Sequence, residues 1–129
     1  TFSGHYFDFE NCISLPRPAN GTIPVIVGGH STAAAKRAGR LGDGFFPGSA
    51  SATEIGELIT LVRQTAEDHG RDPDSIEMIA GAGAPPGPKL DARIEQLAEI
   101  GVTHAIVPTF RPDTLAEIGE SLNATYGHA

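Results

Sequence analysis

From residue 23 onward, short apolar runs alternate with longer segments in which apolar residues recur every three or four positions. The short runs predict strands over 23–27, 42–47, 76–80 and 103–107. The longer segments predict helices over about 32–41, from 51 to about 69, from the loop before Leu90 to Gly101, and over about 113–126. Four consecutive strand–helix units favour a parallel α/β sheet with right-handed crossovers.

The apolar positions within these elements indicate which sides face the core. The strand over 23–27 is mostly β-branched, which is typical of a strand buried on both faces. Two helices carry apolar stripes that we expect to be buried: Ile55, Leu58, Ile59, Val62 and Ala66 in one, and Leu115, Ile118, Leu122 and Tyr126 in the other. His104 lies within the last apolar strand, where a core histidine is the expected role.

Residues 1–22 follow a different pattern and form a lead-in, whereas residues 23–129 form the repeating units. Half of the eight aromatic residues lie here, and the alternation over 6–10 predicts an extended strand or hairpin arm. Proline, asparagine and glycine over 15–21 predict turns and a loop. We expect this lead-in to pack against the main body.

Four strand–helix units are half the number that closes an eight-stranded TIM-type barrel. An open half of this kind leaves two unpaired sheet edges and an apolar face. The sequence therefore predicts a parallel (βα)4 half-barrel that pairs with a copy of itself or is completed by another segment.

The junction of the first strand and helix carries candidate chemistry. Gly28 and Gly29 allow a sharp turn, and Ser31 is a suitable N-cap for the helix that follows. A strand, a glycine turn and a helix N-terminus together offer free N–H groups and a favourable dipole to an anion such as a cofactor phosphate. The alternative is a tight connection with nothing bound, and the glycine pair alone does not decide between them.

Charge and composition restrict the possible partners. Nine basic and sixteen acidic residues in 129 give a net charge of −7, which disfavours nucleic acid and anionic membranes. No apolar run is long enough to span a bilayer, and no signal peptide is visible. A single cysteine, Cys12, fits a cytoplasmic protein and is expected to be an unremarkable half-buried thiol. No spacing of histidines or carboxylates suggests a metal site.

Over essentially its whole length the chain resembles the C-terminal half of the luciferase-like monooxygenase family. The likeness is carried, in order, by Phe2-Ser3-Gly4-His5-Tyr6-Phe7 with Leu15-Pro16-Arg17-Pro18, by Pro24–Gly29 with Ala35–Phe46, by Gly70–Pro73, and by Leu97–Pro108. The resemblance implies half of a (β/α)8 oxidoreductase that uses FMN or the deazaflavin coenzyme F420 on a small-molecule substrate. It also implies that backbone N–H groups at Gly28 and Gly29 contact the cofactor phosphate, with His30 and Ser31 as possible side-chain donors.

Three further positions have expected roles. We expect Asp43 to order the local backbone, with a chemical role as the alternative, and Gly44 to leave room near the barrel end. Arg111 follows the last strand, where it could hold an acidic group of the substrate or cofactor, or could pair with solvent or Asp113.

The N-terminal half of the barrel, which in this family supplies much of the flavin bed and of the proton chemistry, is missing from the match. Catalytic residues are therefore unknown, and we expect the isolated chain to be inactive. A non-catalytic, self-associating half-barrel is the alternative interpretation.

Overall fold

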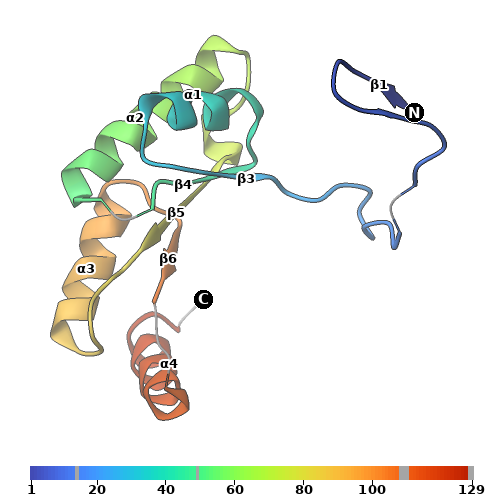
Figure 1. Cartoon of the computed structure of the whole chain (residues 1–129). Coiled ribbons are helices and arrows are strands. Elements are labelled where there is room, and N and C mark those ends of the chain that lie inside the picture. Colours follow the sequence, from blue (N-terminus) through green and yellow to red (C-terminus); the bar gives the residue numbers. More distant parts are fainter. Residues whose placement is uncertain (14, 49, 108–110, 128–129) are drawn as a thin grey trace.

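Four parallel strands form the centre of the chain in the computed structural model, which describes residues 1–13, 15–48, 50–107 and 111–127. They are β3 (Ile26–Gly28), β4 (Gly44–Phe46), β5 (Glu77–Gly81) and β6 (His104–Ile106). Their order in the sheet follows their order in the sequence, and every pair is parallel (Figure 1). The predicted parallel α/β sheet is confirmed.

Each of these strands is followed by a helix. The helices are α1 (Thr32–Leu41), α2 (Ala52–Asp68), α3 (Pro88–Glu99) and α4 (Pro112–Tyr126), with a short 3-10 turn, η1 (Pro73–Ser75), before β5. Right-handed crossovers between strands in consecutive order bring successive helices to the same side of the sheet. Helices α1, α2 and α3 accordingly line one face, and none of the described residues forms a covering layer on the other face (Figure 1). This winding is that of a barrel and differs from a doubly wound sheet.

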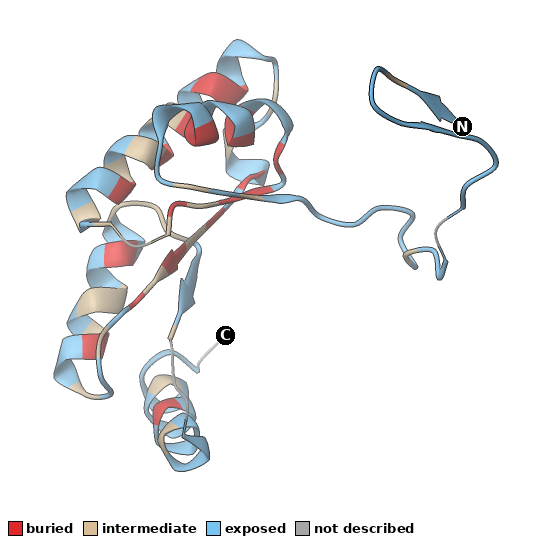
Figure 2. Cartoon of the chain, in the orientation of Figure 1, coloured by how far each residue is buried: buried red, intermediate tan, exposed pale blue. Residues whose placement is uncertain are grey.

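The core lies between the sheet and these helices. Phe45, Ile55, Val62, Met78 and Leu97 are at most 1% exposed. Figure 2 shows the buried residues gathered along this interface. The predicted stripe on α2 is confirmed, because Ile55, Ile59, Val62 and Ala66 are buried and Leu58 is half-buried.

Local signals in the sequence mark the helix ends correctly. The Ser31 Oγ accepts a hydrogen bond from the Ala34 N–H at 3.2 Å, as an N-cap does. Ser51 and Glu54 form a complete capping box at the start of α2. Gly70 and Gly101 follow α2 and α3 with φ of 69° and 93°, a conformation that glycine adopts at little cost.

One long-range contact fixes the end of α1 and has no local signal in the sequence. The Arg71 guanidinium donates to the carbonyls of Ala38 (3.3 Å), Gly39 (2.8 Å) and Gly42 (2.7 Å). It thereby adds donors at the end of the helix, where carbonyls lack intrahelical partners, and shares the Ala38 carbonyl with the Gly42 N–H. Arg71 thus ties the turn before β5 to the end of the first strand–helix unit.

The prediction that the first strand is buried on both faces is wrong. The strand begins at Ile26, and both Ile23 (72%) and Val25 (57%) are exposed. Because β3 is at the edge of the sheet, it has β4 as a neighbour on one side alone within the described residues. Its second face belongs to the uncovered side, which we call the open face: Ile26, Gly28, Gly44, Phe46, Glu77, Ile79, Gly81, His104 and Ile106.

The last unit is also more exposed than its pattern predicts. In α4, Ile118 is buried and Leu122 is half-buried, whereas Leu115 and Tyr126 are exposed. His104 is exposed on the open face and is not a core histidine. Both differences follow from the position of β6 at the far edge of the sheet, where one side lacks a neighbouring strand in the described chain.

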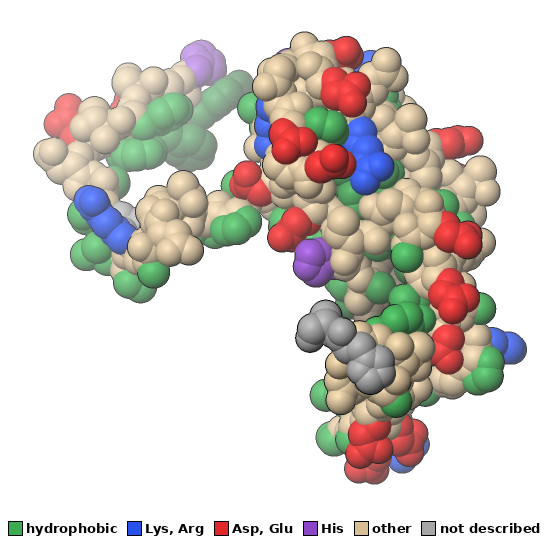
Figure 3. Space-filling view, turned by 180° about the vertical axis from the view of Figure 1, so that it is seen from behind, with side chains coloured by type: hydrophobic (Ala, Val, Ile, Leu, Met, Phe, Trp, Pro, Cys, Tyr) green, Lys and Arg blue, Asp and Glu red, His purple; other side chains and the backbone are tan. Residues whose placement is uncertain are grey.

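The lead-in forms an arm whose hairpin pairs β1 (Phe2–Ser3) with β2 (Asp8–Phe9). The Phe2 and Phe9 rings stack with centroids 5.5 Å apart, and Tyr6 and Phe7 are exposed. Figures 1 and 3 show the arm standing apart from the body, with apolar side chains gathered on it. The expected packing against the body is therefore not seen, and Cys12 is exposed where half-burial was expected.

Within the described residues, none of the helices is both long enough and apolar enough to cross a bilayer.

Candidate functional site at the carboxyl edge of the sheet

The carboxyl ends of all four strands lie along one edge of the sheet, because the strands are parallel. In sheets of this kind the loops at that edge carry the ligand sites. Two depressions lie there, one beside the start of α1 and one bounded by the ends of β4, β5 and β6 together with α3.

The turn between β3 and α1 depends on Gly29. Its φ is 127°, and its N–H donates to the Phe46 carbonyl at 3.0 Å. A Cβ at this position would lie 3.0 Å from the Ala34 Cβ. Gly29 therefore shapes the turn, and its own N–H is occupied within the chain.

Gly28 differs from Gly29 in that its surroundings are empty. A Cβ placed on Gly28 would meet no described heavy atom within 4 Å, and its φ lies outside the left-handed region. The backbone at the end of β3 is therefore open to close approach by another group.

The first turn of α1 presents unpaired donors. Within the described part of the chain, the N–H groups of His30, Ser31, Thr32 and Ala33 make no hydrogen bond, as expected for the start of a helix. The Ser31 hydroxyl accepts from Ala34 and keeps its own proton for donation. With the dipole of a ten-residue helix behind them, these groups can hold an anion of phosphate size.

A cavity of about 470 Å³ adjoins this helix start. Its described lining residues are His30, Ser31, Thr32, Ala50, Glu54, Glu57, Leu58 and Leu61. Hydrogen bonds from the Ser51 side chain and backbone, with a smaller contribution from His30, lower the pKa of Glu54 below its ordinary value of 4.5. Glu54 is therefore ionised at neutral pH. This negative charge opposes the anion that the helix end attracts, so the site is only moderately favourable to anions.

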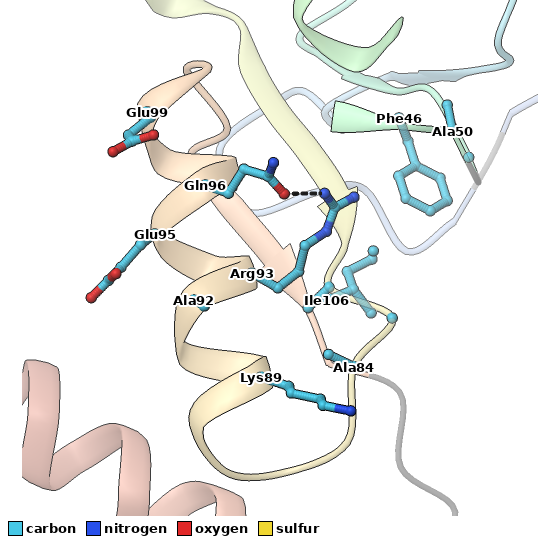
Figure 4. Close-up of a pocket in the computed structure, with 14 residues that line it drawn as sticks. Phe46, Ala50, Ala84, Lys89, Ala92, Arg93, Glu95, Gln96, Glu99 and Ile106 are labelled. Carbon is cyan, nitrogen blue, oxygen red and sulfur yellow. Dashed lines mark hydrogen bonds between the residues drawn. The ribbon is translucent and has the colours of Figure 1, made fainter. Parts of the chain in front are cut away.

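The second depression, of about 1180 Å³, is larger and more apolar (Figure 4). Phe46 and Ile106 extend from the ends of β4 and β6, and the end of β5 with the loop after it contributes Gly81 to Ala84. From α3 come Lys89, Ala92, Arg93, Glu95, Gln96 and Glu99. The Arg93 Nη1 donates to the Gln96 Oε1 at 2.7 Å, which orients the guanidinium along the helix. Apolar walls with a few charged groups suit a small organic ligand.

The structure also shows where the other residues singled out in the sequence lie: Asp43, Gly44 and Arg111. The Asp43 Oδ2 accepts from the Val25 N–H at 2.8 Å, which confirms that it orders the backbone. Gly44 lies at the start of β4, where the Ile26 Cδ1 occupies the space that its Cβ would fill. The room it leaves is therefore used by the chain itself. Arg111 is the exposed residue that precedes α4 and is not among the described residues lining either depression.

Sequence reasoning missed the side chains that α3 brings to the larger depression. Lys89, Arg93 and Gln96 recur at helical spacing directly after a glycine–proline loop that follows a strand. The place of this helix in the sequence could have revealed them, because a helix that starts directly after such a loop borders the carboxyl edge of the sheet. Among the described residues, no group of three or more His, Cys, Asp or Glu side chains could hold a metal ion.

Comparisons with known proteins agree with the fold. The family described as luciferase-like monooxygenase matches residues 1–124. An uncharacterized protein of Mycobacterium tuberculosis is 34% identical over 119 residues, which cover 88% of this chain and 39% of that protein. An F420-dependent glucose-6-phosphate dehydrogenase of Mycolicibacterium fortuitum is 36% identical over 80 residues, which cover 60% of this chain and 24% of that enzyme.

Among solved structures, the coenzyme F420-dependent tetrahydromethanopterin reductase of Methanopyrus kandleri superposes with a TM-score of 0.69 at 16% identity. The match covers 91% of this chain and 54% of the reductase, and at this identity it shows the fold alone. The chain therefore spans about two fifths of the length of the M. tuberculosis relative and about half of the reductase.

Proposed function

The chain belongs to the luciferase-like monooxygenase family, and on that premise we propose that it is the C-terminal half of an oxidoreductase that uses FMN or F420. Its part in the reaction is to hold the cofactor phosphate at the start of α1. The observation that carries the proposal is the combination of open space at Gly28 with the unpaired N–H groups of residues 30–33. The name of the M. fortuitum relative supports F420 as one of the two candidate cofactors.

We assign the four residues at the turn different tasks. Gly28 lets the phosphate approach the backbone, and Gly29 fixes the direction in which α1 begins. His30 contributes its backbone N–H and an imidazole that can donate a hydrogen bond. Ser31 caps the helix and can donate its hydroxyl proton to the phosphate.

The larger depression is the proposed place for the organic substrate. The redox chemistry belongs to the cofactor when it is bound. In this chain, Phe46 and Ile106 would exclude water from the reacting groups, and Lys89 and Arg93 would attract an anionic group of the substrate. Because the open face lacks its other half in the described chain, we expect the isolated chain to bind cofactor weakly and not to turn over substrate. A cytoplasmic location, which the single cysteine favours, is part of the same proposal.

The proposal is tested by fluorescence titration of FMN and F420 into the chain and into Gly28→Val. Valine at Gly28 meets open space and a suitable φ, so the fold is retained while the phosphate approach is blocked. We expect affinity to fall at least about tenfold, the loss expected from removing one or two charge-assisted hydrogen bonds. Gly119→Val is the matched control, because Gly119 in α4 also faces open space and lies away from the turn.

Unchanged affinity in Gly28→Val, or a wild-type chain that binds neither cofactor, would contradict the proposal. Gly29→Val is unsuitable as the test, because its positive φ and the nearby Ala34 make loss of the turn a competing cause.

A further inference from the structure

The cavity beside the start of α1 combines donors for an anion with fixed negative charge. Residues 30–32, whose N–H groups make no hydrogen bond within the described chain, line this cavity together with Glu54 and Glu57 of α2. No lysine or arginine is among the described residues that line it. An anion is therefore attracted here by backbone N–H groups and by the helix dipole, which is equivalent to about half an elementary charge.

Glu54 is held in this position by the capping box of α2. Its Oε2 accepts hydrogen bonds from the Ser51 hydroxyl at 2.6 Å and from the Ser51 N–H at 2.9 Å. The Glu54 N–H in turn donates to the Ser51 Oγ at 3.2 Å. The carboxylate cannot turn away without breaking these bonds, and they also lower its pKa, so that it is ionised at neutral pH. A ligand in the cavity therefore meets a negative charge whose position is fixed.

The charge of a phosphate group determines how strongly this carboxylate opposes its binding. A phosphomonoester, as in FMN, loses its second proton near pH 6 and carries close to two negative charges at neutral pH. A phosphodiester, as in F420, has no second proton to lose and carries one negative charge. Because the Coulomb energy is proportional to the product of the charges, the carboxylate repels the monoester about twice as strongly as the diester.

We propose that Glu54 sets the cofactor preference of this site and favours a singly charged phosphodiester over a doubly charged phosphomonoester. The inference rests on the proposed function, which assigns a cofactor phosphate to the start of α1, and adds the residue that selects between the two candidate cofactors. The second charge of a monoester is attracted by about half an elementary charge at the helix end and repelled by the full charge of Glu54. Glu57, one helical turn further along α2, acts in the same direction. F420 therefore suits the site better than FMN.

The test compares FMN with its monomethyl ester, which has the same flavin ring and a phosphodiester of one negative charge. Each ligand is titrated by fluorescence into the wild-type chain and into Glu54→Gln at pH 7.5 and low salt. Glutamine at this position can keep the capping box, so α2 begins as before. We expect the affinity for FMN to rise about tenfold in Glu54→Gln and the affinity for the diester about threefold. The ratio of the two affinities thus shifts about threefold toward FMN, and any steric effect of the methyl group cancels in this comparison.

Glu67→Gln is the matched control, because it removes the same charge from an exposed position at the other end of α2. It should leave the ratio of the two affinities unchanged. Both titrations are repeated in 1 M NaCl, which screens charges over about 3 Å. The shift in Glu54→Gln should then disappear, whereas a shift caused by altered packing would persist.

The inference is overturned if Glu54→Gln changes the ratio no more than Glu67→Gln does, if the change persists in 1 M NaCl, or if Glu54→Gln binds neither ligand. Titration of Gly28→Val with the same two ligands is read independently. If Gly28→Val weakens the binding of both and Glu54→Gln leaves the ratio fixed, the charge selection fails and the proposed function stands. If Gly28→Val changes neither affinity, the proposed function fails and this inference fails with it.

Discussion

The two faces of the sheet differ in burial and in residue type, although the same strands form both. On the helix-covered face, Phe45 and Met78 are at most 1% exposed and interlock with apolar residues of α2 and α3. On the open face, the alternate residues of the same strands include glycines, a glutamate and a histidine, and Ile26 and Ile106 are exposed. The covered face therefore supplies most of the stability of the chain, and the open face adds little to it.

The largest loss of stability should come from removing a large side chain from the helix-covered face. Phe45→Ala leaves a cavity in the core between the sheet and the helices and should lower the free energy of unfolding by about 3–5 kcal/mol, measured by urea denaturation. The paired change on the other face, Ile106→Ser, should alter it by less than about 0.5 kcal/mol, because that side chain is already exposed. Equal losses in the two variants would show that the open face is covered in solution.

A smaller loss of stability should follow from removing the hydrogen bonds that hold the end of α1. Arg71→Ala removes three hydrogen bonds from a half-buried guanidinium to the end of that helix, which should cost about 1–3 kcal/mol. Arg40→Ala, an exposed change in the last turn of α1, serves as the control and should cost about 0.3–0.5 kcal/mol. If the two variants unfold at the same urea concentration, the contacts of Arg71 do not stabilise the unit.

The smallest effect concerns the capping box of α2 and depends on pH. Hydrogen bonds from Ser51 lower the pKa of Glu54 in the folded chain, so the stabilisation is present above the unfolded pKa and is lost as the pH falls through the folded value. Ser51→Ala should therefore lower the melting temperature by a few degrees at pH 7, and the difference from wild type should narrow below pH 4.5. A difference that stays constant down to pH 3 would argue against this contact.

Local signals in the sequence were sufficient for the order of the strands and helices and for the helix ends. Ser31, Ser51 and Gly70 each act on residues within one helical turn, so their patterns predict the structure that is observed. Arg71 could not be assigned in the same way, because it contacts carbonyls 29 to 33 positions earlier in the chain.

Apolar patterns, by contrast, predict that a residue is buried but do not predict which part of the protein covers it. Leu115, Tyr126 and residues 23–26 have core patterns and are exposed here. They belong to the first and last strand–helix units, whose strands form the two edges of a sheet that lacks further strands in the described chain. The candidate site shows the same limit. The pattern indicated the glycine turn and the capped helix, whereas the occupied Gly29 N–H and the nearby Glu54 depend on packing between separate units.

The central claim, that the start of α1 holds a cofactor phosphate, is tested most directly by following backbone amide resonances in NMR titrations with FMN and with riboflavin, which lacks the phosphate. The account predicts that the amides of residues 30–33 shift with FMN and stay in place with riboflavin. Equal shifts with both ligands, or shifts confined to the larger depression around Phe46 and Arg93, would contradict it.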